Sequence, residues 1–211
     1  MNREFKDLFY EKLLLSELSF KEQSDFLVSM TSYLSHGRTE EINGRTLDYV
    51  RDRLNRLLEF LYALDFNQKE IVQIITTYPA ILNAVDNLYE KYLFLGVIEN
   101  MDDSLRRNKL LNKPRDFMIG LNKIYARYKL IVDSGYNSFT WNSLVHASDK
   151  EFSSIFIKTN YDKPYQIFDN ELQVLDYLSS VDMSEFDLDV FKEMAVNEEL
   201  VSRYESKGKR Y

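Results

Sequence analysis

The chain of 211 residues is 45% hydrophobic and 29% charged, a composition that supports a folded domain rather than a disordered segment. It contains no cysteine, which excludes disulfide frameworks, thiolate metal sites and cysteine nucleophiles. Its formal net charge of -7 argues against a general binder of duplex DNA, whose phosphates attract an excess of lysine and arginine.

The sequence contains no apolar run near the roughly 20 residues that a membrane span requires, and its first residues lack the apolar core of a signal peptide. We therefore expect a soluble cytoplasmic protein without a membrane partner. Only six glycines and three prolines are present, which disfavours the many turns of an all-β fold. The sequence predicts an all-α fold with helices joined by short loops.

Helical spacing of apolar residues predicts a first helix over residues 3–17. Ser19 and Glu22 form a capping-box signature that opens a second helix, which ends near His36 and Gly37. A third helix is expected over residues 44–63, because its apolar residues keep the i, i+3, i+4, i+7 register. These residues are Leu47, Val50, Leu54, Leu57, Leu58 and Leu61.

Asn67 and Glu70 form another capping signature, and Pro79 should end the short helix that follows, because the residue before proline avoids helical angles. Three more helices are expected, near residues 85–96, 101–111 and 121–134. In the last of these, Lys123 and Arg127 lie four residues apart and are predicted on the side opposite the core.

Beyond Gly135 the pattern predicts two short helices, over residues 138–147 and 149–158, the second capped by Ser148 and Glu151. Two further helices are expected, over residues 172–178 and 188–204. The loop at residues 160–164 is the best candidate boundary. We expect a helical repeat-like domain over residues 1–160 and an acidic helical extension over residues 161–211, packed on the first.

Charge is unevenly distributed along the chain. Residues 169–211 carry a net charge of -6, whereas a basic segment over residues 106–129 contains one acidic residue, Asp116, and carries +7. The basic segment is either a solvated helix face or a candidate nucleic-acid-binding surface, and it can attract the acidic end of the chain. Its members are Arg106, Arg107, Lys109, Lys113, Arg115, Lys123, Arg127 and Lys129.

Three similar segments, 55–61, 89–95 and 125–131, start 34 and then 36 residues apart. The second and third are preceded by matching stretches, 74–82 and 110–118, each with an apolar pair, a proline and another apolar pair. A period of this length is typical of helical repeats, in which each helix pair gains a core by stacking on its neighbours. The sequence therefore predicts stacked helical hairpins in a short solenoid.

This pattern, over residues 44–135, resembles the repeat of the mitochondrial transcription termination factor (mTERF) family. The resemblance implies a curved superhelix whose basic concave side binds nucleic acid, and it places Lys91 and Arg127 at the family's basic position. It also implies scaffold roles for the proline and apolar positions of the motif. These are Pro79, Ile81, Leu82, Pro114, Phe117 and Met118.

No catalytic or metal-binding motif is present. His36 and His146 lie far apart in sequence, and the sequence places no nucleophile near them. His146 is interpreted as a partly buried packing residue. Asp182, Glu185, Asp187 and Asp189 do not match the spacing of a calcium loop and are interpreted as charges at a helix N-terminus. We expect a non-enzymatic protein without a cofactor, a catalytic residue or a metal ligand.

Basic and aromatic residues alternate over residues 123–129, as in proteins that stack single-stranded bases on aromatic rings. Tyr125 and Tyr128 fall on the predicted core stripe, however, so packing is the favoured interpretation for these two rings.

The leading hypothesis is a protein that binds RNA or DNA, or a nucleoprotein complex, through residues 106–129. The acidic C-terminal segment would act as an internal competitor. The alternative is an adaptor or inhibitor of a nucleic-acid-processing machine, of a phage or mobile-element type, that contacts a basic protein partner through its acidic helices. A homodimer through the stripe from Leu47 to Leu61 is compatible with both hypotheses.

Overall fold

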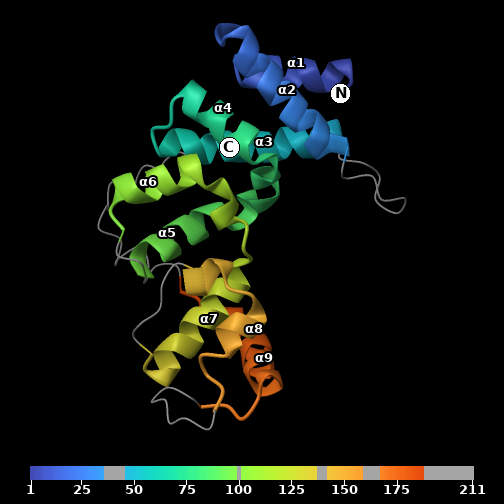
Figure 1. Ribbon diagram of the computed structural model, residues 1–211. Helices are drawn as coiled ribbons and strands as arrows, with labels where there is room; N and C mark the ends of the chain where they lie inside the picture. Colours follow the sequence, from blue (N-terminus) through green and yellow to red (C-terminus); the bar gives the residue numbers. More distant parts are fainter. Residues whose placement is uncertain (36–45, 99–100, 137–141, 159–166, 188–211) are drawn as a thin grey trace.

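The computed structural model describes residues 1–35, 46–98, 101–136, 142–158 and 167–187 (Figure 1). Within these ranges the regular elements are helical, apart from one isolated backbone bridge between Ile157 and Phe168. The helices form an elongated array, with α1 and α2 at one end and α7, α8 and α9 at the other (Figure 1). The predicted all-α fold is confirmed.

The N-terminal end is formed by α1 (Arg3–Lys12), the 3-10 turn η1 (Leu15–Glu17) and α2 (Phe20–Ser35). The predicted single helix over residues 3–17 is wrong, because Leu14 adopts a left-handed conformation with φ of 44° and the chain turns there. This turn lets Leu13 and Leu15, on either side of it, both enter the core.

The capping boxes predicted from sequence all form. The Ser19 amide donates to Glu22 Oε2 at 2.8 Å, and the Glu22 amide donates to Ser19 Oγ at 3.3 Å. Asn67 caps α4 (Gln68–Thr77), and Ser148 caps α8 (Asp149–Ser153), in the same reciprocal way. Each pair satisfies amides that a helix start leaves without an intrahelical partner, and so fixes where the helix begins.

The repeats consist of a long helix, a shorter helix and a proline-initiated turn. The first contains α3 (Leu47–Ala63), α4 and the 3-10 helix η2 (Pro79–Asn87), and the second contains α5 (Leu88–Ile98), α6 (Asp103–Asn112) and η3 (Pro114–Phe117). A third begins with α7 (Leu121–Ser134) and is followed by the π-helical turn η4 (Asn142–His146) and α8. The helix predicted near residues 85–96 begins later, because its first residues belong to η2.

The motif's scaffold residues lie where the family resemblance implied. Ile81, Leu82, Pro114 and Phe117 are buried, while Met118 is partly buried against the main core. The apolar residues after each proline therefore fill the space between consecutive repeats.

The interior is divided into two apolar clusters. The main core extends from Leu8 in α1 to Tyr125 in α7, and a smaller core joins α7, η4, α8 and α9 (Glu171–Ser180). Tyr128 and Val145 pack against both clusters, so the two cores are continuous. Five of the six apolar stripe residues of α3 are buried within the main core, which rules out this stripe as a surface for a second copy of the chain.

The segment after residue 166 packs back onto the repeats. Val174 of α9 is fully buried in the smaller core. Beyond the 3-10 turn η5 (Met183–Glu185), the Phe186 ring lies 5.7 Å from that of Phe94 and 5.2 Å from that of Tyr125, both edge-on. The predicted domain boundary at residues 160–161 and the predicted helix over residues 188–204 lie outside the described residues.

Candidate nucleic-acid interface

The eight basic residues predicted to form one surface differ sharply in burial. The side chain of Arg106 is 3% exposed, and that of Arg127 is fully buried. The prediction that these two cations face solvent is therefore wrong. Both are enclosed by protein groups, so neither can reach a phosphate without unfolding of the surrounding structure.

Arg127 connects α7 to the segment that follows it. Its Nη1 donates to the Leu144 carbonyl at 2.7 Å, and its Nη2 donates to the Ala147 carbonyl at 2.8 Å and to Asp149 Oδ1 at 2.9 Å. The guanidinium carbon lies 4.8 Å from the centre of the Phe152 ring. A planar guanidinium suits this position because it donates in several fixed directions at once.

Lys123 does lie beside Arg127, as predicted, and shares its acidic partner. Its Nζ lies 2.8 Å from Asp149 Oδ1, and its side chain is 45% exposed. Hydrogen bonds from Lys123 and then from Arg127 lower the pKa of Asp149, because both stabilise the carboxylate. Asp149 thus carries its charge between one exposed cation and one buried cation.

Arg106 and Arg107 brace α6 against its neighbours. The guanidinium of Arg106 lies 5.3 Å from the centre of the Tyr92 ring, and its aliphatic stem crosses Gly96 so closely that a Cβ there would lie 2.1 Å from Arg106 Cδ. Arg107 Nη2 donates to Glu70 Oε2 at 2.5 Å and to the Asp65 carbonyl at 3.2 Å, which ties α6 to α4 and to the turn before it.

The position that the resemblance assigned to a basic functional group is internal in this chain. Lys91, like Arg127, is buried, and its Nζ donates to the carbonyl of Phe117 at 2.6 Å, at the end of η3. Burial lowers the pKa of Lys91 to about 8, because the interior disfavours its charged form. In α3, Arg53 and Arg56 both donate to Asp86 near the end of η2.

A common arrangement emerges from these contacts. In each repeat, one or two cations of the long helix hold the end of the irregular turn that follows. Sequence reasoning missed this role, although the aligned Lys91 and Arg127 of the repeat were the available signal. The two residues recur at the same position of successive repeats because each joins its long helix to the turn that follows.

The remaining cations of the predicted surface are more accessible. Lys113 and Arg115 are exposed, and Lys109 and Lys129 are half-buried. Three of them, Lys109, Lys113 and Arg115, fall within seven residues that contain no acidic side chain, at the end of α6 and the start of η3. This short cluster is the most strongly basic part of the accessible segment.

A hollow of about 360 Å³ lies on the solvent side of α6, next to this cluster. It is lined by Met101, Leu105, Asn108, Lys109, Asn112 and Lys113. Cations, amides and an exposed apolar side chain therefore meet at one place.

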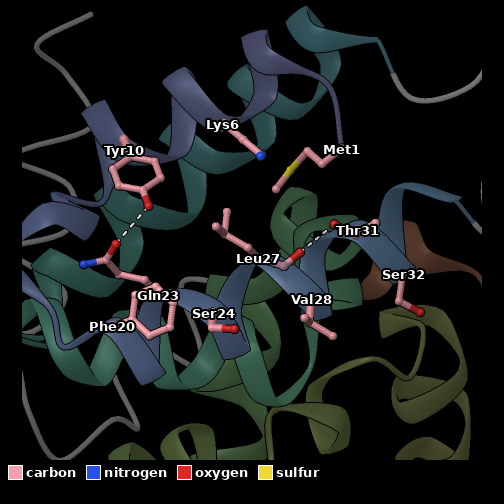
Figure 2. A pocket seen from close by; sticks show the side chains of 10 residues that line it. All are labelled: Met1, Lys6, Tyr10, Phe20, Gln23, Ser24, Leu27, Val28, Thr31 and Ser32. Atoms are coloured by element: carbon pink, nitrogen blue, oxygen red, sulfur yellow. Dashed lines mark hydrogen bonds between the residues drawn. The ribbon is translucent and has the colours of Figure 1, made fainter.

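A larger hollow, of about 600 Å³, lies between α1 and α2 at the N-terminal end of the array (Figure 2). It contains apolar side chains such as Leu27 and Val28, with a hydrogen bond of 2.9 Å from the Tyr10 hydroxyl to Gln23 at one side (Figure 2). Lys6 is its one charged lining residue. This hollow has little of the positive charge that a phosphate backbone requires.

The acidic excess of the C-terminal part lies in the described structure. Residues 169–187 contain six acidic and no basic residues, whereas residues 188–211 contain five of each. Hydrogen bonds that Asp182 accepts from Ser184 lower the pKa of Asp182. The charge of Lys129 in α7 lowers it further, so Asp182 lies near this helix. Asp182 therefore lies near the C-terminal part of the basic segment.

Structural contacts also involve Tyr125, Tyr128 and His146. Tyr125 and Tyr128 pack edge-on against Phe94, which agrees with the favoured interpretation as core residues. His146 is exposed rather than a packing residue, and its Nε2 lies 3.1 Å from Asp116 Oδ1, linking η4 to η3. His36 and Asp189 lie outside the described residues.

In the part of the chain that the structure describes, no group of three or more histidine or acidic side chains is arranged to hold a metal ion. No described helix is both long enough and apolar enough to cross a membrane.

Comparison with protein families decides the relationship that the repeat suggested. The sequence model of the mTERF family matches residues 11–153, which is more than half of the chain. The chain belongs to the mTERF family. The match extends beyond the repeats recognised at residues 44–135 and covers the structure from the end of α1 through α8.

As an mTERF protein, the chain belongs to a family of helical proteins that bind nucleic acid. Comparisons with curated proteins and with solved structures find no match. The segment that contains α9 and the acidic residues 169–187 lies beyond the family match.

Proposed function

We propose that this mTERF protein is a non-enzymatic factor that binds RNA or DNA through the accessible cations of residues 106–129. The observation that carries the proposal is the cluster of Lys109, Lys113 and Arg115 on a member of a nucleic-acid-binding family. Lys123 and Lys129 extend the surface along α7. Arg106 and Arg127 support it from inside, by holding α6 and α7 against their neighbours.

The chemistry of these side chains determines the kind of binding. Lysine and arginine neutralise backbone phosphates and release their counterions, so affinity should fall as salt increases. Such contacts position a nucleic acid without reading its sequence. The net charge of -7 does not prevent such binding. Salt screens the charges that lie far from the bound nucleic acid, so the local charge of the contacting surface determines the attraction to phosphates.

The proposal is tested by fluorescence polarisation with labelled single-stranded RNA, single-stranded DNA and duplex DNA, at low and physiological salt. A triple charge reversal, Lys109→Glu, Lys113→Glu and Arg115→Glu, should weaken binding of the preferred probe about tenfold or more. The matched control reverses three exposed cations of α1, α2 and α3, with the same change in net charge. These are Arg3→Glu, Lys21→Glu and Arg51→Glu.

The outcomes separate the hypotheses. Loss of affinity in the first variant and not in the control supports the interface. Equal loss in both means that only overall charge matters, which contradicts the assigned surface. No binding of any probe by the unmodified protein contradicts the proposal and favours the adaptor or inhibitor hypothesis, for which a pull-down is the next experiment.

We also propose that the acidic residues 169–187 reduce binding by competing with phosphates near α7. The position of Asp182 close to Lys129 supports this regulation. Deleting the whole segment from residue 169 would not test it, because that removes Val174 from the smaller core. Point neutralisation is the suitable change.

A further inference from the structure

The hollow on α6 combines features that a purely electrostatic surface does not need. Leu105 lies at one side of the hollow, next to the half-buried Met101, and is 55% exposed. Leu110, on the opposite side of the same helix, is fully buried. An exposed apolar side chain contributes nothing to the attraction of a phosphate backbone. It can stabilise a ligand that brings an apolar face of its own.

Two amides lie in the same hollow and are fixed by each other. Asn112 Nδ2 donates to Asn108 Oδ1 at 2.5 Å and to the Asn108 carbonyl at 3.1 Å. Within the described residues these two hydrogen bonds leave Asn108 Nδ2 and Asn112 Oδ1 available to a ligand. A donor and an acceptor are thus presented by neighbouring turns of one helix face, a combination that matches the hydrogen-bonding edges of nucleobases.

Lys109 and Lys113 complete the arrangement. They lie four residues apart on the same face of α6 as the amides, so both ammonium groups belong to one side of the helix. The volume of about 360 Å³ is at the lower end of the range for small-ligand sites, so it suits one small ligand group rather than a helical duplex.

We infer that this hollow binds one unpaired nucleotide of a single strand, with the base on Leu105 and the adjoining phosphates at Lys109 and Lys113. The base would meet the amides of Asn108 and Asn112 with its edge. The inference rests on the proposed function and specifies its ligand: single-stranded rather than duplex nucleic acid. In a duplex the base faces are stacked and covered, so Leu105 would have no apolar partner and only the two lysines would act.

The test compares a labelled single strand of about 12 nucleotides with the duplex of the same sequence, made as RNA and as DNA. The variant is Leu105→Gln, which keeps the length and helix preference of the side chain and removes its apolar surface. Val132→Gln on α7 is a matched control, because Val132 is also 55% exposed. Circular dichroism verifies that both variants fold.

We expect the single strand to bind more tightly than its duplex, whichever sugar is preferred. Leu105→Gln should weaken single-strand binding about fivefold, at the low end of the range for contacts with one base, and should leave duplex binding unchanged. Val132→Gln should change neither. Photocrosslinking from a 4-thiouridine strand should label a peptide that contains residues 101–113.

Two results would overturn the inference while leaving the proposed function intact. One is equal binding of single strand and duplex, with both weakened by the triple reversal of Lys109, Lys113 and Arg115. The other is a preference for the single strand that Leu105→Gln does not alter and that crosslinks elsewhere. Absence of binding to every probe would instead refute the proposed function, and this inference with it.

Discussion

Lys91 Nζ donates a hydrogen bond of 2.6 Å to the carbonyl of Phe117, although the lysine side chain is buried in the main core. The contact joins the long helix of one repeat to the end of the turn that closes it. Arg127 makes the corresponding contacts one repeat later, to the carbonyls of Leu144 and Ala147. Basic residues in this protein therefore have two separate roles, internal support and surface charge.

Burial of the Lys91 ammonium should make the free energy of unfolding vary with pH in the alkaline range. Its pKa is about 8 in the folded protein and 10.5 without burial, so between these values the unfolded chain binds a proton that the folded chain does not. The contribution of Lys91 to the free energy of unfolding therefore increases as pH rises through this window. Below pH 8 both states are protonated and the cost of burying the charge is fully present.

Comparison with Lys91→Met isolates this effect. The free energy of unfolding of the wild type, minus that of the variant, should rise by about 2 kcal/mol between pH 7 and pH 9.5. Urea denaturation at a series of pH values measures it. A difference that stays constant with pH would show that Lys91 keeps its proton in the folded protein throughout this range, with a pKa near its ordinary value.

Replacement of Arg127 should destabilise the smaller core. Arg127→Met leaves two carbonyls without their donors, and we expect a loss of about 3 kcal/mol in the free energy of unfolding. Lys123→Ala removes the exposed partner of the same Asp149 and should cost less than about 1 kcal/mol. Similar losses in the two variants would contradict the distinction between the buried and the exposed cation.

Gly96 should tolerate no side chain. In Gly96→Ala the new methyl group would collide with the stem of Arg106, which is itself buried, and we expect a loss of about 2 kcal/mol or more. Gly120→Ala meets no atom within 4 Å and should change stability by less than about 1 kcal/mol. Thermal melts of the two variants provide the comparison.

Salt dependence should report the number of phosphates contacted. If Lys109, Lys113 and Arg115 each neutralise one phosphate of a single strand, the logarithm of the association constant should fall with that of salt concentration with a slope of about -2 from these residues. The triple reversal should flatten the slope by this amount. An unchanged slope would place the phosphate contacts elsewhere.

Neutralising the acidic segment should strengthen binding. We expect the variant Asp176→Asn, Asp182→Asn, Asp187→Asn to be retained on heparin to a higher salt concentration than the wild type. Truncation after Asp187 removes five acidic and five basic residues and should leave retention nearly unchanged. Stronger retention only after truncation would assign the competition to residues 188–211 instead.

The sequence alone determined the local features of this protein. Helix starts at Ser19, Asn67 and Ser148 were predictable because the capping side chain and its partner lie three residues apart. The proline turns and the spacing of the repeats were visible for the same reason, since each depends on neighbours along the chain.

Tertiary structure alone decided which cations are available to a ligand. Lys123 and Arg127 have the same helical register, but only Arg127 is covered, because η4 and α8 bring acceptors to it from 17 to 22 residues away in sequence. Periodicity measures the position of a side chain around its own helix and contains no information about which later segment folds over it. The basic segment could therefore be found from the sequence, whereas its division into internal braces and an accessible surface required the packed structure.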